Sequence, residues 1–259
     1  FGLVVILIIL SAIFAPLLAP MDPYQSSMLN RLKPIGYKDF ILGTDELGRD
    51  ILSRILYGGR ISLTMGILPV FIATVIGGLL GIIAGFVGGR TNMTIMRIMD
   101  VFYAFPSILL AVAISGALGG GIFNGMMSLT LVFIPPLCRV AETATSQVRN
   151  LDFVEAARAT GASTFSIIRV HILGNVLGPI LIYSSSLVSV SILIASGLSF
   201  LGLGVTPPEP DWGLMLNTLR QAIYIQPVIC ALPGVAILVT SICFNLVSDG
   251  LRSAMDVRM

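Results

Sequence analysis

Six apolar stretches separated by polar segments follow one another along this chain of 259 residues. A helix that crosses the hydrocarbon core of a bilayer needs about 20 apolar residues, and each stretch is close to that length or longer. The third stretch contains Pro106 and the fourth contains Pro135 and Pro136, so we expect both helices to be kinked or locally unwound. The pattern predicts six transmembrane helices, at about residues 1–19, 61–87, 98–118, 126–144, 176–200 and 227–247.

Composition agrees with this pattern and argues against other classes of protein. Charged side chains make up 11% of the residues, against roughly 25% in soluble domains. The hydrophobic fraction is 56%, and the mean hydropathy is +0.97. The net charge of +2 gives no field that would attract nucleic acid. A soluble enzyme, a disordered chain and a nucleic-acid binder are therefore disfavoured. The sequence predicts an all-α membrane protein with a single transmembrane domain over residues 1–259.

The chain begins at Phe1, without a methionine, and is apolar from that residue onward. We expect a further segment to precede Phe1 in the natural protein. The first apolar stretch is not expected to be a cleaved signal peptide, because it is still present in the chain.

Basic residues are divided almost evenly between the two sets of connections. The connections after the second, fourth and sixth stretches contain eight Lys or Arg residues, and the opposite connections contain seven. Six of those seven lie in residues 21–60, a long segment that also carries five acidic residues, and long loops constrain orientation less than short ones. The distribution alone favours, by a small margin, cytoplasmic positions for both termini.

Glycines recur at every fourth residue of the second stretch and just beyond it, at Gly77, Gly81, Gly85 and Gly89. Such a row leaves one face of a helix flat and lets another helix approach closely within the membrane. We interpret the four glycines as a helix-packing surface without chemistry of its own.

The first long connection is expected to end in an amphipathic helix. Thr44 can cap this helix, with Asp45 and Glu46 in its first turn, where the helix dipole favours acidic side chains. Asp50 and Arg54 are four residues apart and are expected to form an ion pair. The helix would lie at the membrane interface before the second span. Its polar face is either a solvated rim or a contact for a solute.

The connection after the fourth stretch, residues 150–172, carries a second candidate surface. Asp152 can cap a short helix, and Glu155, three residues later, is placed to complete a capping box. Gly161 ends or bends that helix, and a second amphipathic stretch begins at Thr164. Small and apolar side chains on such a helix fit the groove of a cytoplasmic partner. An interfacial loop helix would give the same pattern.

Residues that could carry chemistry are few. Lys33 and Lys38 are the only lysines and neither follows a glycine, so the chain has no Walker A loop with which to hydrolyse ATP. The single histidine, His171, lies near Arg169 at the edge of the fifth stretch, and we interpret it as a polar interface residue rather than a metal ligand or a catalytic base. The three cysteines lack metal-ligand spacing and are expected to be buried thiols.

Ionisable residues inside the apolar stretches are also rare, namely Asp100, Arg139 and Glu142. A proton- or sodium-coupled carrier usually buries more of them. A secondary transporter or a channel is therefore a less favoured alternative. An intramembrane serine hydrolase is less favoured still, because His171 lies at the edge of its stretch rather than deep within it.

Several sequence blocks resemble one family of transport proteins. The segment FVEAARATGAS, Phe153–Ser163, resembles the EAA loop of ABC-importer permeases, in which Glu-Ala-Ala is followed after three residues by glycine. Further blocks resemble the dipeptide/oligopeptide/nickel subfamily, and specifically its second, C-type permease subunit. These blocks are Leu42–Leu63, Met99–Ala111, Leu198–Leu216 and Pro233–Arg258. Together the resemblance extends from about Asp39 to the end of the chain.

The resemblance implies a fold and a set of partners. The fold would be the six-helix type I permease of ABC importers, with a cytoplasmic coupling helix in the loop 150–172 and an extracytoplasmic loop at 21–60. The chain would be a non-catalytic subunit that forms half of a translocation pathway with a homologous second permease. Two cytoplasmic ATP-binding subunits would bind ATP and Mg, so this chain would hold no cofactor or metal. An extracytoplasmic substrate-binding protein would deliver the solute.

The same resemblance implies a location and a site. The chain would lie in the bacterial inner membrane as a multi-pass protein with both termini cytoplasmic, and the loops 21–60 and 205–226 would face the binding protein. The solute would be a peptide or a related small molecule, with a nickel or metal chelate as an alternative. The residues that match the EAA motif, and would contact one ATPase subunit, are Phe153, Glu155, Ala156, Ala157 and Gly161.

The chain departs from the family pattern at the entry to the fifth span. Gly174 stands where the family usually has a proline, so we expect this junction to be more flexible. The segment Ile134–Arg139 also differs from the usual pattern, and we interpret both differences as variation within a branch of the family.

Overall fold

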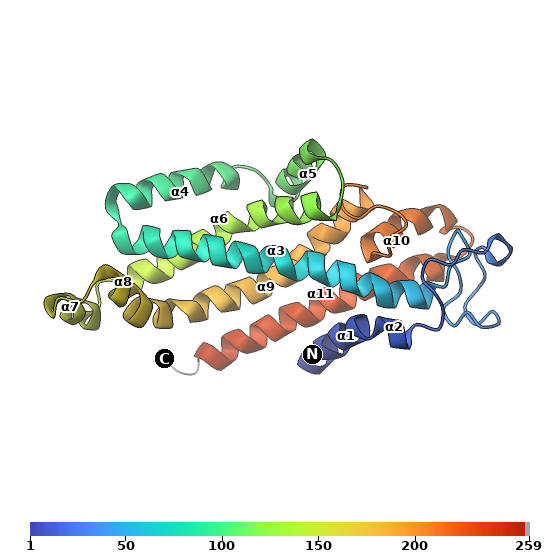
Figure 1. The fold of residues 1–259 in the computed structure, drawn as a ribbon, viewed down its shortest axis with the longest axis horizontal. Coiled ribbons are helices and arrows are strands. Elements are labelled where there is room, and N and C mark those ends of the chain that lie inside the picture. Colours follow the sequence, from blue (N-terminus) through green and yellow to red (C-terminus); the bar gives the residue numbers. More distant parts are fainter. Residues whose placement is uncertain (257–259) are drawn as a thin grey trace.

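The computed structural model describes residues 1–256, and in this part the chain forms an elongated bundle of helices (Figure 1). The last residues of the Pro233–Arg258 block lie outside the described range. Short 3-10 helices occur at Met28–Asn30 and Arg220–Ala222, and a π-helix at Ile168–Ile172. The α-helices, in chain order, are α1 (Gly2–Ile13), α2 (Ala15–Leu18), α3 (Ile51–Val87), α4 (Gly89–Tyr103), α5 (Ser107–Leu118), α6 (Ile122–Val148), α7 (Asp152–Ala159), α8 (Thr164–Ile167), α9 (Leu173–Phe200), α10 (Trp212–Leu219) and α11 (Pro227–Asp256).

Within residues 1–256, four helices are long and apolar enough to cross a membrane: α3, α6, the continuous helix Thr164–Phe200, and Pro227–Met255 within α11. The pair α4 and α5 passes the same test as one broken span, bent by 86°. α1 is apolar but has only 12 residues. Pro16, which lacks a backbone N–H, follows it in the first turn of α2. The expected all-α membrane fold is confirmed, whereas the sixth span stays a prediction.

The prolines in the third and fourth apolar stretches have different effects. The break between α4 and α5 lies at Ala104–Pro106, which confirms the kink expected at Pro106. α6 continues as one helix through Pro135 and Pro136, so the local unwinding expected there is not found. Pro135 is buried against neighbouring helices, and this packing holds the helix together where a backbone hydrogen bond is missing.

The glycine row of α3 faces α6. A Cβ atom added to Gly77 would lie 2.7 Å from the carbonyl oxygen of Ile134, and one added to Gly85 would lie 2.7 Å from that of Glu142. Gly81 similarly abuts the carbonyl oxygen of Cys138. The two backbones therefore touch directly, as small residues spaced by four allow.

Gly89 does not belong to this packing surface. An added Cβ would meet no atom within 4 Å, and its φ of +53° belongs to the turn that starts α4. Residues four apart share a face only within one helix, and α3 ends at Val87, before Gly89.

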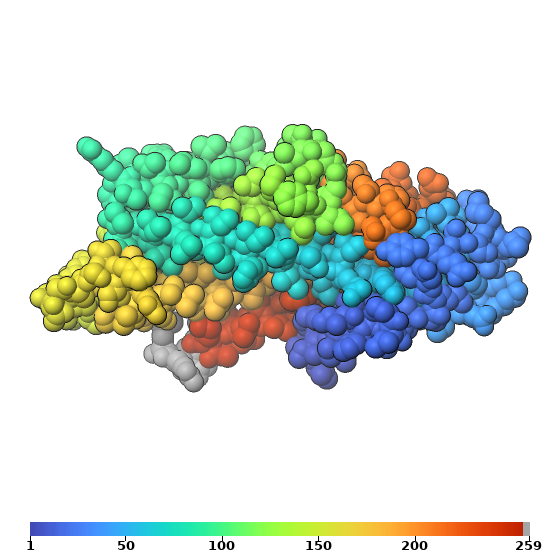
Figure 2. Space-filling view, viewed as in Figure 1, coloured from blue at the N-terminus to red at the C-terminus, as the bar shows by residue number. Residues whose placement is uncertain are grey.

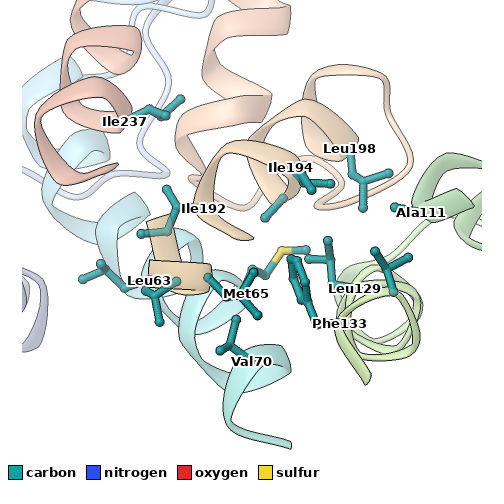
Figure 3. Close-up of a cluster of buried hydrophobic side chains, with 14 of the residues drawn as sticks. Leu63, Met65, Val70, Ala111, Leu129, Phe133, Ile192, Ile194, Leu198 and Ile237 are labelled. Atoms are coloured by element: carbon teal, nitrogen blue, oxygen red, sulfur yellow. The ribbon is translucent and has the colours of Figure 1, made fainter. Parts of the chain in front are cut away.

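The main hydrophobic core lies where α3, α6 and α9 meet (Figure 3). Met65 of α3, Leu129 and Phe133 of α6, and Ile192 and Leu198 of α9 are almost fully buried there. A second cluster lies at the end of the bundle that carries α7, and a third at the opposite end, beneath α10.

The two ends of the bundle differ in structure (Figure 1). α7 and α8 project at one end, near the turn between α3 and α4, whereas residues 21–50 and α10 gather at the other. The bundle therefore separates the two candidate surfaces predicted from the sequence.

The helix expected to begin after Thr44 begins later. α3 starts at Ile51, and its N-cap is Asp50, whose carboxylate accepts hydrogen bonds from the backbone N–H of Ser53 (2.8 Å) and from its hydroxyl (2.6 Å). The Thr44 hydroxyl is used elsewhere, because it accepts a bond from the backbone N–H of Lys33 at 2.8 Å. The predicted cap at Thr44 is therefore wrong, and the amphipathic segment is the first part of span α3 rather than a separate interfacial helix.

The ion pair expected between Asp50 and Arg54 is also wrong. Arg54 instead lies 3.4 Å from the carboxylate of Asp45, which pairs with Arg49 at 2.6 Å. Because Asp50 is engaged as the helix cap, its carboxylate points to the backbone of its own first turn and not to the side chain four residues on.

Candidate functional site

The loop 150–172 forms a compact projection at one end of the molecule (Figures 1 and 2). Val154 of α7 is fully buried and anchors this projection. It packs in a cluster with Ile167 and Ile172 from the second half of the loop and with Val176 of α9. The cluster also contains Ala141 of α6. α7 is thus held on the ends of the spanning helices by apolar packing.

The start of α7 differs from the expected capping box. Leu151 occupies the N-cap position and makes no side-chain cap, while its carbonyl oxygen accepts bonds from the N–H groups of Val154 (2.8 Å) and Glu155 (3.2 Å). Asp152 is the first helical residue, so its carboxylate cannot reach forward as a cap. Asp152 and Glu155 lie in the first turn and Arg158 in the last, where each charge is favoured by the helix dipole.

α7 ends at Gly161 in a Schellman motif. The N–H of Gly161 donates to the carbonyl oxygen of Arg158 (3.0 Å), and the N–H of Ala162 donates to that of Ala157 (3.1 Å). Gly161 has a φ of +81°, a conformation that residues with a Cβ rarely adopt. Ala157 and Ala162 are both partly buried against the Val154 cluster, so the turn also packs inward.

The EAA-motif residues divide between the two faces of α7. Glu155, Ala156 and Gly161 are exposed, and Phe153 is 41% exposed with its ring centroid 6.2 Å from that of His171. Ala157 faces the bundle instead. The outer face is therefore a low ridge of small side chains with the carboxylates of Asp152 and Glu155 at its start, a shape that fits the groove of a protein partner.

Phe165 is a further candidate residue that the motif did not identify. Its side chain is 74% exposed on α8, although an aromatic side chain of this size usually finds cover in a finished fold. The sequence signal was present, because Phe165 lies in the amphipathic stretch predicted from Thr164 onward. Phe153 and Phe165 are two exposed aromatic rings on the projecting loop.

Hydrogen bonds join several elements at the opposite end of the bundle. Asp211 caps α10, accepting from the backbone N–H of Leu214 at 3.0 Å and from the Ser62 hydroxyl of α3 at 2.6 Å. Burial raises the pKa of the Asp211 carboxyl above its ordinary value, and the hydrogen bonds from Ser62 and Leu214 offset part of this effect. Trp212 donates from its indole N–H to the Ile55 carbonyl oxygen at 2.9 Å.

The loops at this end are also tied to one another. The Tyr24 hydroxyl donates to the Glu209 carboxylate at 2.8 Å, which joins residues 21–60 to the connection between α9 and α10. This end therefore presents one composite surface rather than two separate loops. Sequence reasoning assigned both loops to one side but did not identify Asp211 and Trp212 as the residues that fix them.

Comparison with known proteins places the chain in a family. Residues 77–259 match the family described as the binding-protein-dependent transport system inner membrane component, and residues 1–34 match the N-terminal TM domain of oligopeptide transport permease C. Among solved structures, an inward-facing MetNI methionine ABC transporter has a TM-score of 0.65 at 19% identity, over 78% of this chain and 97% of that chain. That likeness concerns the fold.

Relatives cover nearly the whole chain. It is 41% identical to the di/tripeptide transport system permease protein DppC of Pseudomonas aeruginosa, over 99% of this chain and 86% of the relative. It is also 41% identical to the glutathione transport system permease protein GsiD of Pectobacterium atrosepticum, over 100% and 86% respectively. The probable D,D-dipeptide transport system permease protein DdpC of Escherichia coli is again 41% identical, over 98% and 85%. The chain therefore belongs to the family of inner membrane components of binding-protein-dependent transport systems, within its C-type peptide permease branch.

Proposed function

We propose that this chain is one of two permease subunits of an ATP-driven importer for short peptides, and that α7 and α8 contact a cytoplasmic ATP-binding subunit. The observation that carries the proposal is the exposed ridge of α7, held by the buried anchor Val154 and ended by Gly161. The absence of a P-loop lysine from the sequence requires an outside source of energy if transport runs on ATP. The relatives named for di/tripeptides, D,D-dipeptides and glutathione support a short peptide as the solute.

The proposal fixes an orientation. With α7 in the cytoplasm, the composite surface of residues 21–60 and α10 faces the extracytoplasmic side, where a substrate-binding protein would dock. An even number of spans would then return both termini to the cytoplasm.

A displacement of the projecting loop would be transmitted to the spanning helices through two connections. α7 follows α6 after a short turn, and α8 continues through the π-helix into α9 as one helix from Thr164 to Phe200. Closure of the ATPase pair would displace α7, and these continuous helices would carry the displacement to the pathway. The free energy of ATP binding and hydrolysis then acts by favouring one of two conformations.

The test is co-purification of the ATP-binding subunits with the permease pair from detergent. Glu155→Lys reverses one of the two exposed acidic groups in the first turn of α7 and should weaken this association, and Gly161→Trp should abolish it. Asp39→Lys makes the same charge change on an exposed residue at the opposite end and serves as the matched control. Full association of the Glu155→Lys and Gly161→Trp variants would refute the assignment of α7 as the contact.

Transport itself is tested in vesicles that contain the reconstituted complex and its binding protein. Uptake of a short peptide should require ATP inside the compartment that holds the ATPase subunits. Uptake that persists without ATP and collapses with an ion gradient would instead identify a secondary transporter.

A further inference from the structure

An ion pair lies on an uncovered surface within the spanning helices. Asp100, near the end of α4, pairs with Arg139 of α6, and the guanidinium of Arg139 also lies 5.0 Å from the ring centroid of Tyr103. The side chains of Asp100 and Arg139 are 46% and 48% exposed, respectively. Charged groups in membrane spans are costly against lipid and face a bundle interior, a partner or a water-filled cavity.

The break between α4 and α5 lies beside this pair. Residues 103–109 are all exposed, and the chain turns by 86° at Ala104–Pro106. Non-helical backbone at membrane depth is tolerated where it is covered by protein or lines a water-filled space. The exposed break is an observation independent of the ion pair. It also indicates that this surface is either covered by protein or lines a water-filled space.

A small cavity adjoins both features. It has a volume of about 150 Å³ and lies between the break, the Pro135–Pro136 segment of α6 and the middle of α9. Its lining residues include Tyr103 and Tyr183, which carry hydroxyl groups, and the aromatic residues Phe105 and Phe133. Ser107, the exposed first residue of α5, lies at its rim. Charge, hydroxyl groups and aromatic surface thus meet at one place on the bundle.

We infer that this surface is a wall of the solute pathway, and that Asp100 and Arg139 contact a solute that carries both an ammonium and a carboxylate group. The inference rests on the proposed function. The guanidinium would bind the solute carboxylate by charge-assisted hydrogen bonds, and the Asp100 carboxylate would bind its ammonium group. The aromatic rings of the cavity would contact the apolar part of the solute. Pairing of Asp100 with Arg139 satisfies both charges when no solute is present.

Thiol labelling tests whether this surface is accessible to water. In the assembled complex in membrane vesicles, Ser107→Cys changes one atom at the rim of the cavity, and a charged, water-borne methanethiosulfonate reagent reacts with the thiolate. Leu238→Cys, on α11 and 55% exposed, is the matched control. The native cysteines are buried, so the unsubstituted complex gives the background. Ser107→Cys should react about tenfold faster than Leu238→Cys or more. Equal rates would overturn the inference.

This measurement does not depend on transport. Failure of the proposed function would appear as an absence of ATP-driven uptake by the unsubstituted complex, whatever the labelling rates are. If the complex transports but Ser107→Cys reacts no faster than Leu238→Cys, the pathway assignment alone is overturned.

Neutralising the ion pair tests contact with the solute. The double variant Asp100→Asn with Arg139→Gln removes both charges and keeps both side chains polar. Uptake of a zwitterionic dipeptide should fall by about tenfold or more, as expected for the loss of charged hydrogen bonds, while the loaded binding protein still stimulates ATP hydrolysis. Retention of both activities, or parallel loss of both, would overturn solute contact.

Glu142→Gln provides the control for this double variant. It removes a charge about one turn along α6, where the carboxylate accepts hydrogen bonds from Asn92 (2.7 Å) and Ser146 (3.0 Å) and lies away from the break. Uptake by the Glu142→Gln complex should remain close to that of the unsubstituted complex. A loss as large as that of the double variant would show that any removed charge in this region has the same effect, and would overturn the inference.

Discussion

Replacing Gly161 with alanine should loosen the projecting loop without disturbing any packing contact. An added Cβ at Gly161 would meet no atom within 4 Å, so the substitution carries no steric clash. Its φ of +81° remains unfavourable for alanine, and this left-handed conformation costs about 1–2 kcal/mol. The free energy that opens the Schellman turn should fall by that amount.

Hydrogen–deuterium exchange of residues 152–167, followed by mass spectrometry on the purified protein, measures this opening. The amides of α7 and α8 should exchange about 5- to 30-fold faster in Gly161→Ala than in the unsubstituted protein. Asparagine tolerates positive φ better than alanine does, so Gly161→Asn should show a smaller increase.

Gly174→Ala is the matched control. Gly174 is also exposed and also has no atom within 4 Å of an added Cβ, but it lies inside α9 with helical backbone angles. Alanine should stabilise that helix by up to about 1 kcal/mol and slow exchange there. Unchanged exchange in Gly161→Ala, or equal acceleration in both variants, would refute the argument that positive φ governs the stability of this loop.

Three further predictions concern the anchor, the glycine row and the buried acid. Val154→Ala removes two buried methyl groups and should lower the free energy of unfolding of the loop by about 1–3 kcal/mol, measured by the same exchange. Gly81→Leu forces a side chain against the backbone of α6 and should cost more than about 3 kcal/mol, seen as loss of monodisperse protein in gel filtration. Gly78→Leu should leave the protein monodisperse, because an added Cβ at Gly78 would meet no atom within 4 Å. Burial raises the folded pKa of Asp211, so the folded state binds the proton more tightly and stability contributed by this group falls as pH rises above the unfolded value of about 3.9. Asparagine stays neutral at this position, so the thermal stability of Asp211→Asn relative to the unsubstituted protein should rise as pH rises above about 4, and a difference that does not grow with pH would contradict this reasoning.

The helical fold and the glycine contact could be predicted because each depends on a local pattern. The row from Gly77 to Gly85 lies inside one helix, so its spacing alone specifies a flat face. The row ends where that helix ends. The spacing of four places Gly89 in the row, although the dipeptide Gly88–Gly89 is itself a turn signal.

The helix starts could not be predicted from local chemistry, because several residues compete for each cap. Thr44 and Asp50 are both good N-caps, and the choice between them depends on contacts with residues 30–33 that are visible only in the fold. At α7, Leu151 starts the helix because the chain leaves α6 in a tight turn, which places Asp152 one position too late to cap.

The motif alone does not separate the two faces of α7. Of the motif residues, Ala157 packs against the bundle together with Val154, whereas Phe153 and Ala156 are exposed. The difference arises because the buried face is set by the cluster at the ends of α6 and α9, and not by the composition of α7 alone.

Direct backbone contact between α3 and α6 has a mechanical consequence. Where Gly77, Gly81 and Gly85 meet the carbonyl groups of α6, no side-chain rotamers exist that could absorb sliding of one helix past the other. We therefore expect the two helices to translate and rotate together as one rigid unit. If α7 is the contact for an ATP-binding subunit, its displacement would reach both helices, because α7 follows α6 after a turn of three residues. We expect bending of the bundle to concentrate where the backbone is interrupted, at Ala104–Pro106 between α4 and α5.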